Sequence, residues 1–159
     1  MDFLSRIRQG TLTQLESTTH VALMTTTIHL REISDIINDE LLGVARAAVE
    51  RPAIRIEPAM LSEFYGRVQQ AVQLAVTAVS RTDGEASAKV LALSGEVRQL
   101  GEALLSKLAE AFNAADPHAS ATLRLQTTFV NALRQTFTLT KRIARNACAP
   151  TDQIAESGP

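Results

Sequence analysis

The sequence predicts an all-α fold, an antiparallel up-down bundle of four long helices. Apolar residues recur every three or four positions through four long segments, which is the spacing of one face of an α-helix. Proline and glycine interrupt the chain between these segments, and no segment shows the sustained alternation and hairpin turns that are typical of β-strands. Four helices joined by short links pack as antiparallel neighbours, so an up-down bundle is the expected arrangement.

The first predicted helix runs from about Thr13 to Glu50. Thr11 and Thr13 follow Gly10 and are suitable N-cap residues. Pro52 ends the segment, because the residue before a proline disfavours the helical conformation. An apolar stripe runs along the whole segment and predicts its buried face: Leu12, Leu15, Thr19, Leu23, Thr26, Leu30, Ile33, Ile37, Leu41, Val44 and Ala48.

The other three predicted helices are also bounded by proline, glycine and capping residues. Pro58 suits a first helical turn, where its missing N–H is not needed. Asp83-Gly84 separates the second helix from the third, and Asp116-Pro117 supplies a cap and a first turn for the fourth. The expected ranges are 58–81, 85–114 and 117–147. We expect one domain over residues 1–149 and a polar, disordered tail over residues 150–159.

Composition excludes several classes of function. The chain has 159 residues and a formal net charge of −1, so it lacks the basic excess that holds nucleic acid or an anionic membrane. No stretch approaches the ~20 apolar residues that a membrane span needs, and the N-terminus lacks the features of a signal peptide. We therefore expect a cytoplasmic location. The single cysteine, Cys148, rules out an internal disulfide and a thiolate metal site.

Charge is unevenly distributed, and the fourth predicted helix is basic. Residues 118–150 contain no acidic residue, and their five basic residues fall within about a third of the helix circumference, opposite the apolar stripe. Guanidinium groups on such a face can hold phosphate or carboxylate through paired hydrogen bonds, so this face is a candidate anion-binding or partner-binding surface. An ordinary solvated face has the same pattern. The five residues are Arg124, Arg134, Lys141, Arg142 and Arg145.

The first predicted helix carries three carboxylates in one column. Glu32, Asp35 and Asp39 are spaced i, i+3 and i+7, and carboxylate oxygens are the ligands that hard cations prefer. A solvated face gives this spacing too, and Arg31 can pair with Asp35 one turn later. We expect no cofactor, with a divalent or ferric ion at this column as the alternative. The sequence nominates no Ser/His/Asp or Cys/His constellation, so we expect a protein without catalytic residues.

Residues 29–49, HLREISDIINDELLGVARAAV, resemble the PhoU-like cytosolic domain at the C-terminus of bacterial sodium-dependent phosphate cotransporters. The family also includes the stand-alone phosphate-uptake regulator PhoU. The resemblance continues upstream through FLSRIRQGTLTQLES and downstream through EPAMLSEFYGRVQQAVQLAVTAV and TLRLQTTFVNALRQTFTLTKRIARNA. It covers roughly residues 3–147 and implies one full three-helix repeat preceded by the last helix of another repeat.

The acidic motif of this family is incomplete in the sequence. The third helix of each family repeat carries Glu or Asp, three further residues and then Asp. In the first copy Asp35 matches, whereas Arg31 and His29 stand where the family has acids. In the second copy the corresponding stretch, NALRQTF, contains no carboxylate. Relatives that keep both motifs bind metal clusters at them, and the resemblance does not carry that metal over to this chain.

The resemblance implies a regulatory or interaction domain associated with phosphate transport, without chemistry of its own. The expected partners are a protein, such as the membrane domain of a phosphate transporter, and a second copy in a homodimer, because a shortened repeat leaves an apolar strip uncovered. The chain would then be cytoplasmic, or the cytosolic part of an inner-membrane protein. A metal-binding helical module built on the carboxylate column is the alternative function. A helical enzyme with a pocket between its helices is a third, for which the sequence names no residue.

The two charged faces suggest a further hypothesis. Glu32, Asp35 and Asp39 can pair with Arg134, Lys141 and Arg145, either within one chain or between two chains. Association through such pairs weakens with salt, whereas association through an apolar interface does not. The sequence alone leaves both forms of association open.

Overall fold

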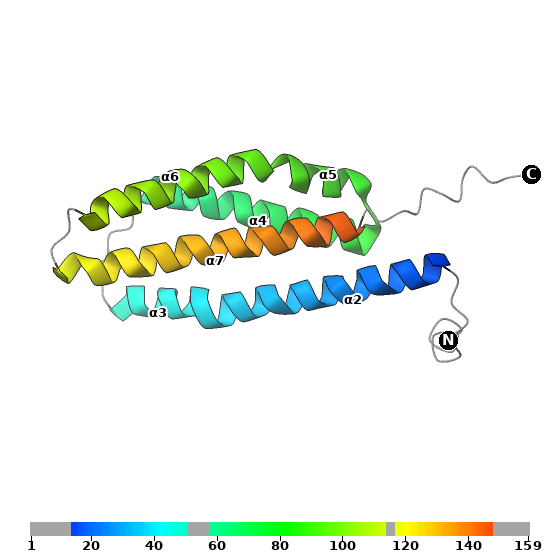
Figure 1. Cartoon of the computed structure of the whole chain (residues 1–159), viewed down its shortest axis with the longest axis horizontal. Helices are drawn as coiled ribbons and strands as arrows, with labels where there is room; N and C mark the ends of the chain where they lie inside the picture. The colour runs from blue at the N-terminus through cyan, green and yellow to red at the C-terminus, as the bar shows by residue number, and fades with distance from the viewer. Residues whose placement is uncertain (1–13, 51–57, 114–116, 148–159) are drawn as a thin grey trace, which may run out of the picture.

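The computed structural model describes residues 14–50, 58–113 and 117–147, and almost all of these residues are helical. They form four rods that alternate in direction along the bundle (Figure 1). No strand occurs in these three ranges, so the predicted all-α bundle is confirmed. The helices are α2 (Gln14–Asp35), the π-helix η1 (Ile36–Leu41), α3 (Leu42–Glu50), α4 (Pro58–Arg81), α5 (Gly84–Ala92), α6 (Ser94–Asn113) and α7 (Pro117–Ala147).

The predicted ends of the second and fourth helices agree with α4 and α7. The third predicted helix differs, because α5 ends at Ala92 and α6 begins at Ser94. Serine and glycine are weak helix formers, and Ser94-Gly95 therefore favours a break at this point. The predicted caps Thr11 and Thr13 and the predicted tail over residues 150–159 lie outside the described residues.

A tight turn separates α4 from α5 at the predicted position. Thr82 adopts a left-handed conformation with φ of 52°, and the N–H of Asp83 donates to the carbonyl of Ala78 at 3.0 Å. This bond satisfies one of the carbonyls left free at the end of a helix. The Asp83 carboxylate then caps α5 by accepting a hydrogen bond from the N–H of Ala86 at 3.0 Å. The turn reverses the chain and sets α5 beside α4.

Helix α7 is the shared element of the bundle. It packs against α4, α5, α6 and the α2–η1–α3 rod, and it supplies fully buried Val130, Ala132 and Ala144 to the core. Helical spacing places Ala132 and Leu139 about 180° around the helix from Val130, so two opposite sides of α7 are buried. Buried Thr136 and Thr140 donate their hydroxyl hydrogens to carbonyls one turn earlier, at 2.9 and 2.8 Å, which removes the cost of burying these groups.

Among the described helices, the α2–η1–α3 rod packs against α7 alone. Within the described ranges, no Cα atom of this rod lies within 8 Å of α4, α5 or α6. Its buried strip is therefore narrow and consists of Thr26, Ile33, Ile36 and Val44. The prediction that the whole apolar stripe is buried is wrong for Leu23, Leu30 and Ile37, which are 52%, 45% and 43% exposed. A helix with a single neighbour cannot cover a stripe of that width.

The π-helix η1 adjusts the register of this rod. A regular helix would continue the buried strip from Thr26 and Ile33 to Glu40, because these positions are seven residues apart. A π-helix holds one more residue in its turn, which rotates the following residues around the axis. In the structure Val44 is buried, as its place in the apolar stripe predicts, and Glu40 is only half-buried. The charged side chain keeps contact with water, and an apolar side chain completes the strip.

Substitution of Phe64 on α4 tests the packing of the core. Its side chain is fully buried within the cluster that joins α4, α6 and α7. Removing a buried phenyl ring leaves a cavity, so we expect Phe64→Ala to lower the free energy of unfolding by about 3–5 kcal/mol. Urea denaturation followed by circular dichroism measures this loss. Phe112→Ala is the matched control, because Phe112 is 46% exposed and its loss should change the free energy of unfolding by less than about 1 kcal/mol. Equal losses in the two variants would contradict the described packing.

Candidate functional surfaces

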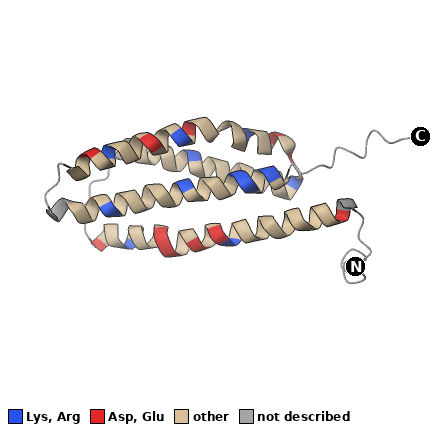
Figure 2. Ribbon diagram, viewed as in Figure 1, with Lys and Arg blue, Asp and Glu red and all other residues tan. Residues whose placement is uncertain are grey.

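The five basic residues of α7 lie along one side of that helix, and we call them the basic row. The Arg124, Arg134, Arg142 and Arg145 side chains are exposed, whereas Lys141 is half-buried. Figure 2 shows Lys and Arg along the middle rod of the bundle, beside the acidic residues of the α2–η1–α3 rod. All five lie on one side of α7, where four arginines face water and where Arg134 and Lys141 also border α6.

Two members of the basic row contact α6. The Lys141 ammonium donates a hydrogen bond to Ser94 Oγ at 3.2 Å and lies 5.3 Å from the centre of the Phe137 ring. The Arg134 stem lies over Gly101 on α6, where an added Cβ would stand 3.3 Å from Arg134 Cδ. Because Gly101 has no side chain, the aliphatic part of Arg134 can pack against the backbone of α6, while Arg134 itself stays exposed. The sequence offered no signal for this contact.

The three carboxylates of the predicted metal site, which we call the acidic column, are all exposed. Glu32 Oε2 lies 3.1 Å from His29 Nδ1, and Asp35 Oδ2 lies 4.0 Å from Arg31 Nε. The predicted pairing of Arg31 with Asp35 is therefore present. Asp39 lies on the π-helix and is exposed. In the described part of the chain, no group of three or more His, Cys, Asp or Glu residues is arranged to hold a metal ion.

The basic row and the acidic column occupy neighbouring rods without touching. Among the described residues, no ion pair joins Glu32, Asp35 or Asp39 to a basic residue of α7. The four exposed arginines of the basic row also have no carboxylate partner within those residues. Pairing within one chain is therefore not observed. The guanidinium groups remain available to carboxylates or phosphates from another molecule.

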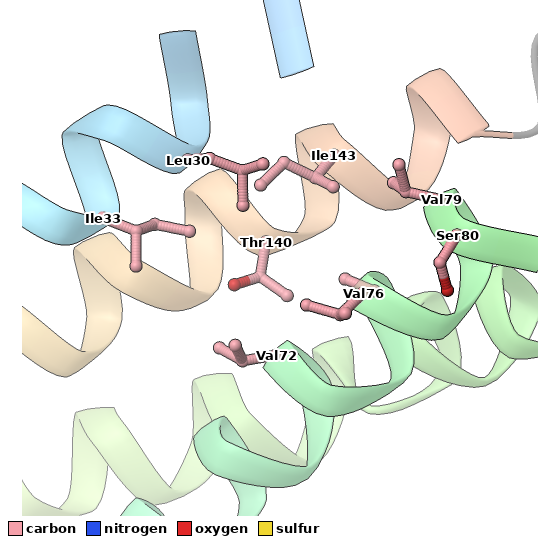
Figure 3. A pocket seen from close by; sticks show the side chains of 9 residues that line it. Leu30, Ile33, Val72, Val76, Val79, Ser80, Thr140 and Ile143 are labelled. Atoms are coloured by element: carbon pink, nitrogen blue, oxygen red, sulfur yellow. The ribbon is translucent and has the colours of Figure 1, made fainter. Parts of the chain in front are cut away.

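An apolar groove separates α2 from α4 and has α7 as its floor. It encloses a volume of about 170 Å³ between Leu30 and Ile33 on α2, Val72 and Val76 on α4, and Ile143 on α7 (Figure 3). Its two hydroxyl groups are satisfied, because Thr140 donates to the Thr136 carbonyl and Ser80 donates to the Thr77 carbonyl. The full lining contains no ionisable residue, so the groove offers apolar contact and no acid–base group: Leu30, Ile33, Val72, Ala75, Val76, Val79, Ser80, Thr140 and Ile143.

A second groove lies between α6 and α7, at one end of the basic row. It has a volume of about 580 Å³ and a mixed lining, in which Leu105, Leu108 and Phe112 are apolar and Arg124 is basic. Phe112 is 46% exposed, which is unusual for a phenylalanine in a bundle. An exposed apolar surface beside an exposed guanidinium group fits a ligand that carries both an apolar group and an anion. Sequence analysis did not identify this groove, because it depends on how two helices meet.

Comparison with known proteins identifies no relative of this chain. The chain matches no family model, no curated protein and no solved structure at a significant level. None of the described helices has the length and apolar character needed to cross a bilayer.

The arrangement of the acidic column predicts that metal ions do not stabilise the protein. Two of its three carboxylates already have a cationic or imidazole neighbour, and all three are exposed, so the column is poorly arranged to share one ion. We expect Mg²⁺, Mn²⁺ or Fe³⁺ to leave the melting temperature unchanged, since only a ligand that binds the folded state raises it. Thermal melts with each ion, together with elemental analysis of the purified protein, test this. A bound metal and a raised melting temperature that Asp35→Asn abolishes would instead establish the metal-binding module.

Proposed function

We propose that the chain is a non-catalytic regulatory or interaction domain associated with phosphate transport, and that it binds an acidic protein partner through the basic row. The observation that carries this proposal is the set of four exposed arginines without a carboxylate partner among the described residues. They lie along one side of a helix whose other sides are packed. A rigid helix holds such groups at fixed spacing, which favours recognition of a complementary acidic surface.

The α6–α7 groove supports a partner with an apolar contact next to its carboxylates. Arg124 belongs both to the basic row and to the lining of this groove. An apolar side chain that entered between Leu108 and Phe112 would exclude water from the neighbouring ion pair. The interaction of a charged pair strengthens when water is excluded, because the local dielectric constant falls. One partner can therefore use the groove and the basic row together.

The association with phosphate transport comes from the resemblance of residues 29–49 to PhoU-like domains. That resemblance suggests that the partner is the membrane domain of a phosphate transporter or another cytoplasmic component of phosphate uptake. The arginines of the basic row also suit free phosphate, since guanidinium groups bind phosphate and carboxylate with similar geometry. A domain of this kind would regulate uptake by binding and release, without transforming a substrate.

Charge reversal in the basic row tests the interaction. We expect the native chain to bind a fluorescent polyglutamate peptide, and Arg142→Glu/Arg145→Glu to weaken that binding at least tenfold, because two attractions become repulsions. Fluorescence anisotropy at low and high salt measures the affinity, which should fall as salt rises. Arg31→Glu/Arg46→Glu is the control with the same change in net charge, since both residues are exposed on the α2–η1–α3 rod. Equal loss in both variants would show a general charge effect and contradict a specific basic row.

The role in phosphate transport has its own test. In the native host, we expect deletion of this chain to change the rate of radiolabelled phosphate uptake, and the unmodified chain to restore it. Arg142→Glu/Arg145→Glu should fail to restore the rate, whereas Arg31→Glu/Arg46→Glu should succeed. An uptake rate that does not respond to the deletion would refute the association with phosphate transport. It would leave the binding measurement on the basic row unaffected, so the two parts of the proposal are tested separately.

A further inference from the structure

Helix α2 and the start of η1 expose an uncharged stripe with the spacing of a coiled-coil seam. Leu23, Thr27, Leu30, Ser34 and Ile37 follow one another at intervals of four, three, four and three residues, and all five side chains are exposed. The four residues on α2 fall within about 60° of the helix circumference, and Ile37 follows them on η1, so we call the five together the seam. A seam with this spacing is the surface that one helix presents to another in a coiled coil.

The seam borders the apolar α2–α4 groove. Leu30 belongs to both, because it lines the groove together with Val76, which is itself 53% exposed on α4. Leu23 and Ile37 lie two turns before and two turns after Leu30 on the same side of the helix. The seam and the groove together form an apolar trough along α2, and a helix is the element that fills a trough of this shape.

We infer that a second copy of this chain occupies the trough, with the two α2 helices packed antiparallel around a two-fold axis. Each α2 helix then lies against the seam of its partner and covers the partner's α2–α4 groove. The contact is isologous, because the same surface is used by both copies, and it closes as a dimer. This inference concerns a different surface from the basic row, so it goes beyond the proposed function.

The pattern of large and small residues along the seam is complementary to itself. In an antiparallel pair centred between Leu30 and Ser34, Leu30 of one copy faces Ser34 of the other, and Ile37 faces Thr27. Each large side chain of these layers therefore meets a small one. Alternation of large and small residues across an interface allows close packing without voids. A helix of unrelated sequence would need to supply the same alternation.

The polar groups of the seam can be buried at little cost. The Thr27 hydroxyl donates to the Leu23 carbonyl at 2.9 Å, and Ser34 Oγ accepts from Asn38 Nδ2 at 3.4 Å. Hydroxyl groups that keep a hydrogen-bond partner do not lose one when water is excluded. The nearest charged residue, Arg31, lies beside Asp35 on its own helix, which reduces the repulsion between two identical copies.

The available area fits a weak dimer. The seam from Leu23 to Ile37 is roughly 20 Å long, at ~1.5 Å per residue. With the adjoining groove the trough is about two helix diameters wide, or ~20 Å, so it offers on the order of 400 Å² per copy. That area is about half of one side of a standard interface and suits a dimer whose formation depends on concentration.

Sedimentation velocity with a matched pair of variants is the first experiment. We expect the native chain to form dimers between about 1 and about 200 µM, with a dissociation constant that is similar in low and high salt. Leu30→Glu should raise that constant at least tenfold, because it places a carboxylate in the seam. Ile28→Glu is the control, since Ile28 is 53% exposed on the other side of the same helix and should leave the constant unchanged. Circular dichroism establishes that both variants are folded.

Disulfide cross-linking tests the antiparallel register independently of any loss of stability. In a Cys148→Ser background, we expect Thr27→Cys and Ile37→Cys to form no cross-linked dimer alone, but to form one when the two variants are mixed and oxidised. Cross-linking of either variant alone at a comparable rate would overturn the antiparallel arrangement. If sedimentation velocity shows only a monomer at every concentration, the proposed dimer is wrong and the trough binds another protein. Dimers that dissociate in high salt, and that Arg142→Glu/Arg145→Glu abolishes, would also overturn it, in favour of contacts through the basic row.

Discussion

The shared packing of α7 is the constraint on which the rest of the structure depends. All three other rods contact this helix, and it buries two opposite sides against them. Such a helix must present small or apolar residues over most of its circumference, as Ala132, Val130 and Ala144 do. Its buried threonines are tolerated because each hydroxyl bonds to its own helix. Only one strip of α7 remains in contact with water, and all the exposed arginines of the helix lie there.

The same arrangement explains why two surfaces of different character exist. The side of α7 that faces water carries the basic row, whereas the α2–η1–α3 rod stands apart from α4 and leaves an apolar trough. Association through the basic row would respond to salt and would require an acidic partner. Association through the trough would be insensitive to salt and would suit a second copy. The two proposed forms of association would therefore use different faces of one bundle.

Local contacts and helix irregularities determine how exposed the charged residues are. In the π-helix η1, Asp39 is exposed and Glu40 is half-buried. The aliphatic part of Arg134 packs over Gly101 on α6, and Lys141 donates a hydrogen bond to Ser94. The five basic residues therefore differ in freedom, although their helical spacing makes them equivalent. Arg124, Arg142 and Arg145 have no such contact among the described residues, so their guanidinium groups can adapt to a partner.

The sequence by itself determined the four helical rods and their order, because the 3.6-residue periodicity and the Pro, Gly and Asp boundaries are local signals. It also placed the basic residues on one face and paired Arg31 with Asp35, since both relations lie within a single helix. It did not indicate the π-helix or the break between α5 and α6. The tertiary structure decided which part of each apolar stripe is buried. Leu23, Leu30 and Ile37 have the periodicity of core residues, yet they are exposed because α2 packs against one helix instead of two. Both grooves likewise arise where separate helices meet, and no periodicity within one helix specifies the distance to its neighbours.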